Sequence, residues 1–346
     1  MTELFLQEDK VVYEYANRFA KDGYSVTIVY PNTKRKRQLS LKKKLRDFAR
    51  YIVRSINKGY RSKWFNLDKR IRLKWVWSLD SWHPCEKCSV VATAVETAYS
   101  LKDYPSYLQK FYFIQDFENW FYSNRQVLES YHFPMKKIVI AKWLQQIVES
   151  CGEYAVLIPN GFDFRAFSCL QPIEQRDRYS IICMYHVDKR KGIDVAFNTF
   201  GRVMSKYPQT RIILFSVYDR PKDLPEYCDF FKQPGIRFLN QLYNQAAIYV
   251  GPSHIEGWGL TVGEAMQCGC AVACTDNKGY LEMAQNGVTA LTSPVGDAAA
   301  LAENIIHLIE NDGLRIRIAK NGESFIHNFD IDESYNSFKS IITKGS

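Results

Sequence analysis

The chain has 346 residues, and its 46 Lys and Arg against 37 Asp and Glu give a formal net charge of +9. With 46% hydrophobic and 24% charged residues, it has the composition of a globular protein, which excludes disordered and fibrous classes. Residues 34–74 hold seventeen Lys and Arg and two Asp, a charge of +15, and the rest of the chain carries −6. The basic excess is therefore local, and the length is typical of two domains.

The sequence also argues against membrane-spanning and secreted classes. It contains no run of 18 apolar residues. Residues 1–9 are acidic and lack the apolar centre of a signal peptide. The nine cysteines are an odd number spread along the chain, several of them inside apolar runs, as buried free thiols are. We therefore expect a reduced, cytoplasmic protein.

Short apolar runs alternate with amphipathic stretches along most of the chain. The expected strands are residues 25–30, 71–77, 89–94, 111–114, 137–141, 154–158, 180–185, 211–215, 237–239, 248–250, 271–275 and 290–292. The clearest expected helices are residues 11–21, 143–150, 195–206 and 261–267, and three further helical patterns follow Asp297. This alternation predicts an α/β protein with two doubly wound domains of parallel strands and a cleft between them.

The basic block contains an amphipathic pattern over residues 41–56. Its apolar stripe is Leu41, Leu45, Phe48, Ile52 and Ile56, and its basic face is Lys42, Lys43, Lys44, Arg46, Arg50 and Arg54. Basic helices with an apolar stripe commonly lie on anionic membrane surfaces, where each basic residue contributes on the order of 1 kcal/mol. The alternatives are a helix whose stripe packs on the domain core, and a nucleic-acid surface, which no recognised RNA motif supports.

Two further polar groups lie in the first half of the chain. Cys85 and Cys88 have C-x2-C spacing, but no second pair stands at the spacing of a zinc finger, so ordinary thiols are expected. Gln115, Asp116 and Glu118 directly follow the expected strand 111–114. There they are candidates for acceptor contact or for a general base, with surface or structural roles as the alternative.

The most informative segment is residues 251–266, between an apolar strand and a helix that starts near Thr261. Open α/β sheets bind ligands at such strand ends. Gly257 and Gly259 allow the backbone to approach a ligand closely, and the positive end of the helix favours an anion such as a diphosphate. Glu256 and Glu264 stand eight positions apart, so both carboxylates can border one ligand, with Glu264 accepting hydrogen bonds from sugar hydroxyls.

These residues resemble the E-x7-E signature of retaining glycosyltransferases of family 4. Three further segments are similar to family motifs, namely residues 158–163, 189–192 and 268–279 followed by Glu282. The resemblance extends over about residues 10–342, is most specific in the C-terminal half, and looks closest to enzymes of bacterial cell-surface polysaccharide assembly such as rhamnosyltransferases.

The resemblance implies a GT-B architecture of two Rossmann-like domains. It implies an acceptor-side domain over residues 1–162, a linker over 163–178, a nucleotide-sugar domain over 179–328 and a C-terminal helix over 329–346 that crosses back. Glu264 would bind the nucleotide ribose, and Glu256 would contact the transferred sugar. The remaining implied donor contacts are Gly257, Trp258, Gly259, Leu260 and Thr261.

The resemblance also implies that Lys191 neutralises the diphosphate, so that no metal or other cofactor is expected. Two places depart from the family pattern. His186 stands where the family commonly has an Arg, and because imidazole titrates near neutral pH, we expect donor affinity that is weaker or pH-dependent. Gln7 and Glu8 stand where a Gly-Gly loop would follow the first strand, so that strand and loop are either absent or encoded upstream.

The predicted function is transfer of a sugar, with retention, from a nucleotide-diphosphate donor to a lipid-linked or polysaccharide acceptor. The predicted place is the cytoplasmic face of a membrane, with the protein bound peripherally through residues 41–56. The alternative is a catalytically degenerate protein of the same fold that still binds a nucleotide or a glycan.

Overall fold

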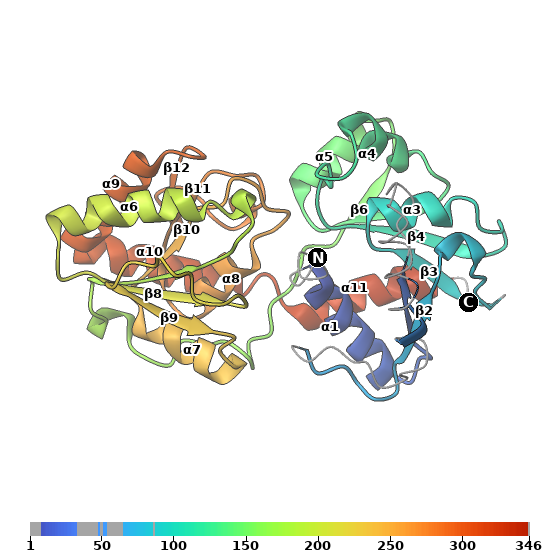
Figure 1. The fold of residues 1–346 in the computed structure, drawn as a ribbon, viewed down its shortest axis with the longest axis horizontal. Coiled ribbons are helices and arrows are strands. Elements are labelled where there is room, and N and C mark those ends of the chain that lie inside the picture. Colours follow the sequence, from blue (N-terminus) through green and yellow to red (C-terminus); the bar gives the residue numbers. More distant parts are fainter. Residues whose placement is uncertain (1–7, 33–47, 49–50, 54–64, 86, 345–346) are drawn as a thin grey trace. The chain divides into compact units, whose positions relative to one another are not determined.

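A computed structural model describes residues 8–32, 48, 51–53, 65–85 and 87–344 of the chain. The chain divides into two compact units (Figure 1). Unit 1 comprises Met1–Pro159 together with Ser334–Ser346, and unit 2 comprises Asn160–Glu333. Residues 163–178, where the linker is expected, belong to unit 2.

Unit 1 is built on parallel strands. Strand β1 (Thr27–Pro31) pairs with β2 (Arg72–Val76), and a separate sheet has the order β3 (Ser89–Ala92), β4 (Gln109–Ile114), β5 (Lys136–Val139) and β6 (Ala155–Leu157). The described helices of this part of the chain are α1 (Glu8–Lys21), α3 (Val95–Leu101), α4 (Asn124–Tyr131) and α5 (Lys142–Ser150), with a short 3-10 turn at Leu79–Ser81. Each helix that follows a strand of the four-stranded sheet leads into the next strand, as parallel pairing requires.

The C-terminal helix α11 (Ile331–Thr343) packs within unit 1 from Ser334 onward. Its Phe338 ring lies 4.9 Å from that of Tyr15 on α1 and 5.1 Å from that of Phe113 on β4. The Asp22 carboxylate accepts hydrogen bonds from the Tyr335 hydroxyl and the Lys339 ammonium, both at 2.7 Å. The last helix of the chain is therefore fixed to the first by aromatic packing and by a charge-assisted contact.

Unit 2 contains one parallel sheet with the order β12-β11-β10-β7-β8-β9. The strands are β7 (Ser180–Met184), β8 (Arg211–Ser216), β9 (Cys228–Lys232), β10 (Ile248–Gly251), β11 (Ala271–Thr275) and β12 (Ala290–Ser293). The chain builds outward from β7 in one direction through β8 and β9, and then in the other direction through β10, β11 and β12. The loops after β7 and β10 therefore diverge at the carboxyl edge, the topological switch point where such sheets bind ligands.

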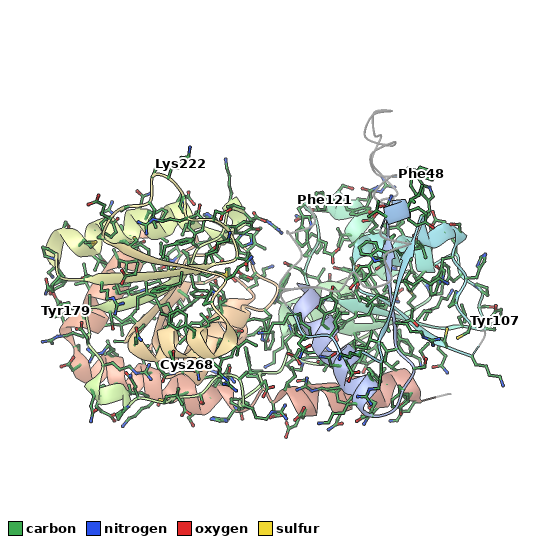
Figure 2. The ribbon with its side chains drawn as sticks, turned by 60° about the horizontal axis from the view of Figure 1, so that its bottom comes forward. Phe48, Tyr107, Phe121, Tyr179, Lys222 and Cys268 are labelled. Carbon is green, nitrogen blue, oxygen red and sulfur yellow. The ribbon has the colours of Figure 1, made fainter. Side chains whose placement is uncertain are left out.

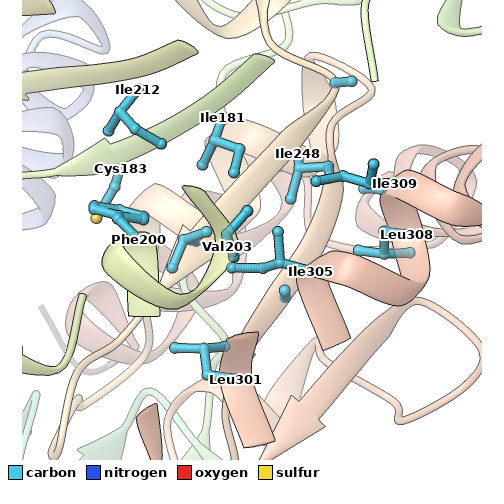
Figure 3. Close-up of a cluster of buried hydrophobic side chains, with 14 of the residues drawn as sticks. Ile181, Cys183, Phe200, Val203, Ile212, Ile248, Leu301, Ile305, Leu308 and Ile309 are labelled. Carbon is cyan, nitrogen blue, oxygen red and sulfur yellow. The ribbon is translucent and has the colours of Figure 1, made fainter. Parts of the chain in front are cut away.

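Helices cover both faces of this sheet. They are α6 (Ile193–Lys206), α7 (Ile236–Gln245), α8 (Leu260–Gln267), α9 (Ala298–Glu310) and α10 (Asp312–Ile326). On one face, Ile181 and Ile248 pack with Phe200 and Val203 of α6 and with Ile305 of α9 (Figure 3).

The opposite face of the sheet meets α7 and α8. On β10, the side chains of Ile248 and Val250 belong to the core under α6 and α9. Tyr249 between them points to the opposite face, where it contacts Tyr243 on α7 and Thr261 on α8. The expected parallel α/β architecture, with helices on both faces, is thus confirmed for unit 2.

One expected strand is wrong. Residues 237–239 lie inside α7, and the strand that precedes this helix is β9, which the sequence pattern passed over. A window of three residues, Arg237 to Leu239, cannot separate strand from helix, whereas Ile236, Leu239, Leu242 and Tyr243 recur at helical spacing. Strand β9 was missed because Asp229 interrupts its apolar run and Lys232 ends it, at the edge of the sheet, where side chains face water.

The basic pattern over residues 41–56 lies mostly outside the described residues. Of its apolar stripe, Phe48 and Ile52 are described, and both side chains are exposed, as Figure 2 shows for Phe48. The Phe48 ring contacts that of Trp77 at 5.7 Å. No helix within the described ranges is long and apolar enough to span a bilayer.

Candidate functional site

The loop between β10 and α8 brings a buried backbone turn to the carboxyl edge of the unit 2 sheet. Gly259 begins the helix in the left-handed region, at φ 100°. A Cβ atom at this position would lie 2.5 Å from Cδ1 of Tyr280, so both the backbone angle and the space require glycine. No side chain caps the helix at Gly259. The first N–H groups of α8 lack acceptors within the helix, and with its dipole they suit an anion.

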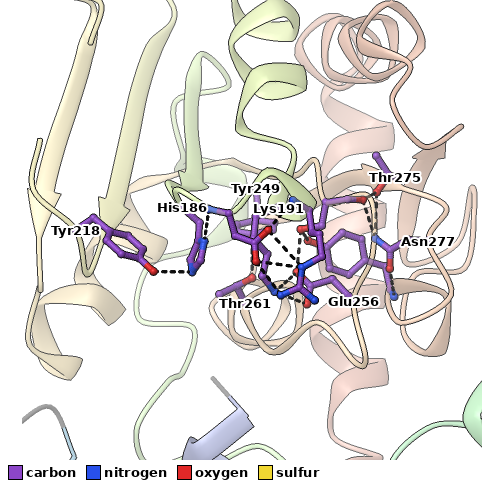
Figure 4. Close-up of polar contacts among 12 residues, drawn as sticks. His186, Lys191, Tyr218, Tyr249, Glu256, Thr261, Thr275 and Asn277 are labelled. Atoms are coloured by element: carbon purple, nitrogen blue, oxygen red, sulfur yellow. Dashed lines mark hydrogen bonds and ion pairs between the residues drawn. The ribbon is translucent and has the colours of Figure 1, made fainter. Parts of the chain in front are cut away.

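Lys191 and Glu256 form an ion pair at this edge (Figure 4). The Lys191 Nζ lies 2.9 Å from both Glu256 Oε1 and Oε2, and the carboxylate side chain is only 8% exposed. Lys191 ends a 3-10 turn, Lys189–Lys191, that follows β7, whereas Glu256 follows β10. The pair thus joins the two loops that diverge at the switch point.

A glycine allows these two loops to meet. Gly192 has φ 64°, and a Cβ atom there would lie 2.1 Å from the carbonyl oxygen of Pro252 in the loop after β10. The backbone of His254 donates to the Arg190 carbonyl at 2.7 Å. The turn that carries Lys191 is therefore tied to the loop that carries Glu256 by close backbone contact as well as by the ion pair.

Glu264 is buried in the second turn of α8 and accepts a hydrogen bond from the Tyr243 hydroxyl at 3.2 Å. The Tyr249 hydroxyl donates to Thr261 Oγ1 at 2.7 Å. Burial is the main cause that raises the pKa of both tyrosines well above the ordinary value, so both keep their protons and remain donors. Two phenols from the sheet and from α7 thus fix the face of α8 that carries Thr261 and Glu264.

Helix α8 and the turn before it are so closely packed that a larger side chain does not fit at Gly263. A Cβ atom at Gly263 would lie 2.0 Å from Cζ of Phe162. The Trp258 side chain, directly before Gly259, is 3% exposed, and its ring packs at 5.3 Å against that of Phe329. The predicted donor residues 256–261 and Glu264 therefore belong to one closely packed turn and helix.

Comparison with known families bears directly on this region. Residues 171–325 match the family described as "Glycosyl transferases group 1". This segment covers β7 to α10 and includes the Lys191–Glu256 pair and the whole of α8. Residues 171–325 are therefore similar to group 1 glycosyltransferases, and they include every predicted donor residue.

Curated relatives resemble the chain over about half of its length. A phosphatidyl-myo-inositol mannosyltransferase of Mycolicibacterium smegmatis is 25% identical over 194 residues, 53% of this chain and 50% of that protein. The capsular polysaccharide biosynthesis glycosyltransferase CapM of Staphylococcus aureus is 25% identical over 178 residues, 47% of each chain. The chain thus matches only about half the length of these relatives.

Solved structures share the fold at low sequence identity. A sucrose-phosphate synthase of Thermosynechococcus elongatus aligns with a TM-score of 0.71 at 16% identity, over 96% of this chain and 92% of that one. HepE of Anabaena, solved in complex with UDP-glucose, aligns with a TM-score of 0.63 at 18% identity, over 73% of this chain and 78% of that one. The expected GT-B fold is confirmed.

His186 differs from its sequence-based expectation. Burial, followed by the charge of Lys191, lowers the pKa of His186 to about 4, so the imidazole is neutral at physiological pH and does not titrate near neutrality. Its Nδ1 accepts from the Asp188 backbone N–H at 2.9 Å, which places the ring proton on Nε2, 3.3 Å from the Tyr218 hydroxyl. The predicted donor site therefore has no positive charge at this position.

The polar residues predicted for the acceptor side lie in unit 1. Gln115, Asp116 and Glu118 are all buried, directly after β4. Glu118 Oε2 accepts from the Val95 backbone N–H at 2.8 Å, at the first residue of α3. Asp116 Oδ1 accepts from the Phe117 backbone N–H at 2.7 Å. Glu118 thus serves as an acceptor for the N-terminus of a helix, which is a structural role.

The cysteines are all free thiols, and those at 85 and 88 are exposed or half-buried. The Cys88 thiol donates to the Cys85 carbonyl at 2.9 Å. Among the described residues there is no group of three or more His, Cys, Asp and Glu side chains placed to hold a metal ion.

Sequence reasoning missed Ser253 and Tyr280, which bond to each other beside Glu256. The Ser253 hydroxyl donates to Glu256 Oε1 at 2.8 Å, and the Tyr280 hydroxyl donates to Ser253 Oγ at 2.9 Å. Ser253 precedes Glu256 by three residues, a spacing at which a hydroxyl can reach a carboxylate. No sequence signal connects Tyr280 with Ser253 or Glu256, because Tyr280 follows β11 and the other two follow β10.

Proposed function

We propose that the protein is a retaining glycosyltransferase that uses a nucleotide-diphosphate sugar as donor. The observation that carries the proposal is the bidentate Lys191–Glu256 pair beside the uncapped N-terminus of α8. A diphosphate at this place would receive one ammonium and several backbone N–H groups, and a sugar beyond it would meet a carboxylate.

In this reaction the bond between the anomeric carbon and the diphosphate oxygen breaks, and a bond to the acceptor oxygen forms on the same face of the sugar. The nucleoside diphosphate leaves, and its departing oxygen takes the acceptor proton. Lys191 and the α8 N-terminus stabilise the negative charge on the leaving group in place of a metal. Because His186 is neutral and both of its ring nitrogens have hydrogen-bond partners within the protein, it borders the donor without adding charge. Glu264 accepts from the ribose hydroxyls.

We further propose that the transferred sugar is a hexose or a deoxyhexose such as rhamnose, and that the acceptor is a lipid-linked saccharide or a growing polysaccharide. Relatives named for a phosphatidyl-inositol acceptor and for capsular polysaccharide biosynthesis support this range. The basic pattern over residues 41–56 would hold the protein peripherally on an anionic, cytoplasmic membrane face. On this proposal Gln115 and Asp116 are candidates for acceptor contact.

A thermal-shift screen with UDP, GDP, ADP and TDP and their sugar conjugates tests the donor class. A preferred nucleotide should raise the melting temperature. At a ligand concentration of 100 Kd, binding adds about 2.7 kcal/mol to the free energy of unfolding. Product analysis by anomeric NMR coupling then tests retention. Binding of a nucleotide without turnover of any sugar conjugate would favour the alternative, a degenerate binding protein of the same fold.

A further inference from the structure

Tyr280 stands in the centre of the donor loop, although it follows a different strand. It begins the 3-10 turn Tyr280–Glu282 after β11, and its side chain is 1% exposed. Its backbone N–H donates to Asn277 Oδ1 at 3.1 Å, and Asn277 Nδ2 donates to the Ser253 carbonyl at 3.1 Å. The turn after β11 is therefore fixed to the loop after β10.

The Tyr280 hydroxyl begins a chain of donors that ends on Glu256. It donates to Ser253 Oγ at 2.9 Å, and Ser253 Oγ donates to Glu256 Oε1 at 2.8 Å. Lys191 contacts both oxygens of the same carboxylate. Burial, followed by the charge of Glu256, raises the pKa of Tyr280 well above its ordinary range, so the phenol keeps its proton and acts as the donor.

The Tyr280 ring has a second contact, with the glycine backbone. A Cβ atom at Gly259 would lie 2.5 Å from its Cδ1, and one at Gly251 would lie 3.0 Å from its Cε2. The ring therefore supports both ends of the loop that leads from β10 into α8. Gly259 is the residue at which the N–H groups of the helix begin.

We propose that Tyr280 is a positioning residue with two separable functions: its hydroxyl orients Glu256 through Ser253, and its ring holds the Gly259 backbone that binds the diphosphate. This inference rests on the proposed donor site. It predicts that the hydroxyl matters for the sugar and the ring matters for the diphosphate, because each part of the side chain touches a different part of the site.

The test compares Tyr280→Phe, Tyr280→Leu and Ser253→Ala with the wild type. Calorimetry measures the Kd for UDP, GDP, ADP and TDP, and release of nucleoside diphosphate from a sugar conjugate of the bound nucleotide measures kcat. For the nucleotide that binds the wild type most tightly, Tyr280→Phe should leave the Kd within twofold and lower kcat roughly tenfold, the effect of about one hydrogen bond. Tyr280→Leu should also weaken nucleotide binding about tenfold.

Ser253→Ala should reproduce the Tyr280→Phe effect, and the double variant should lose little more, because both remove one chain of donors. Tyr112→Phe is the matched control, since this buried tyrosine of unit 1 also contacts a serine hydroxyl, that of Ser130 at 3.5 Å, and should leave both constants unchanged. An unchanged kcat in Tyr280→Phe, or fully additive losses in the double variant, would overturn the inference. A wild type that binds none of UDP, GDP, ADP and TDP would instead refute the proposed donor site and, with it, this role.

Discussion

At the scale of single residues, the site depends on one ion pair that two loops contribute. The Lys191 ammonium forms an ion pair with Glu256 at 2.9 Å. On our proposal, it also binds the diphosphate in the donor complex. The side chains of Lys191 and Glu256 are mostly buried, which strengthens the field that each group exerts on a bound ligand.

Replacing Lys191 by Ala should lower kcat/KM for the sugar nucleotide on the order of 100- to 1000-fold, because the leaving group loses its nearest positive charge. Steady-state release of nucleoside diphosphate measures the effect. Lys189→Ala is the matched control, since Lys189 is an exposed lysine of the same turn, and it should change kcat/KM less than twofold. Equal losses in both variants would mean that the turn, and not the ammonium of Lys191, matters.

His186 should make the protein less stable as the pH falls. Its pKa is about 4 in the folded chain and about 6.5 unfolded, so between these values the unfolded chain binds more protons. The free energy of unfolding should therefore fall as the pH drops from 6.5 towards 4, by at most about 1.4 kcal/mol per pH unit from this group. Chemical denaturation at pH 7, 6 and 5 should show a shallower fall for His186→Gln. Identical slopes would exclude a depressed pKa.

The sequence pattern was enough to single out the residues of the candidate site, but it did not predict the protonation state of His186 or the contacts of Tyr280. The spacing of Glu256 and Glu264 and the glycines between them predicted an anion site before a helix. The neutral form of His186 depends on burial, and the role of Tyr280 depends on contact between two loops more than twenty residues apart, so neither could be read from local sequence.

At the scale of elements, helix α8 is the part that the fold must place most accurately. All of its residues are buried. Two positions require glycine, because an added Cβ atom would overlap Tyr280 at Gly259 and Phe162 at Gly263. Most strands were predictable because they are continuous apolar runs. Strand β9 and helix α7 were not, since an edge strand and a window of only three residues, 237–239, carry weak periodicity.

Gly263→Ala should lower the free energy of unfolding by about 1–3 kcal/mol, because its Cβ would overlap the Phe162 ring. Urea denaturation followed by circular dichroism measures this change. Gly201→Ala is the matched control, since Gly201 lies in the interior of α6 with nothing within 4 Å of an added Cβ. That variant should gain about 1 kcal/mol. A Gly263→Ala variant as stable as Gly201→Ala would contradict the packing described for α8.

The basic segment over residues 41–56 is predicted to bind anionic membranes. Changing Lys42, Lys43 and Lys44 to Gln should weaken binding to vesicles of phosphatidylglycerol and phosphatidylcholine, since each lysine near the surface contributes on the order of 1 kcal/mol. Co-sedimentation with the vesicles at low and high salt measures the bound fraction of each variant. Neutralising the exposed Lys206, Lys222 and Lys320 of unit 2 is the control. Salt-insensitive binding, or no difference between the two triple variants, would favour a helix packed on its own domain.

At the scale of the whole molecule, charge and chemistry are separated along the chain. The net charge of +9 comes from residues 34–74 of unit 1, whereas the segment that matches group 1 glycosyltransferases lies in unit 2. Alternation of strands and helices predicted two α/β units, because each pattern depends only on local periodicity. The switch point between β7 and β10 follows from strand order, which periodicity does not determine.

The central claim is that the carboxylates Glu256 and Glu264 border one nucleotide-sugar site at the N-terminus of α8. Release of nucleoside diphosphate from the sugar nucleotide that best stabilises the wild type tests it most directly, in the wild type, Glu256→Gln and Glu264→Gln. The claim predicts turnover by the wild type and a loss on the order of 100-fold in each variant, with nucleotide affinity weakened mainly by Glu264→Gln. Wild-type turnover in both variants would contradict it.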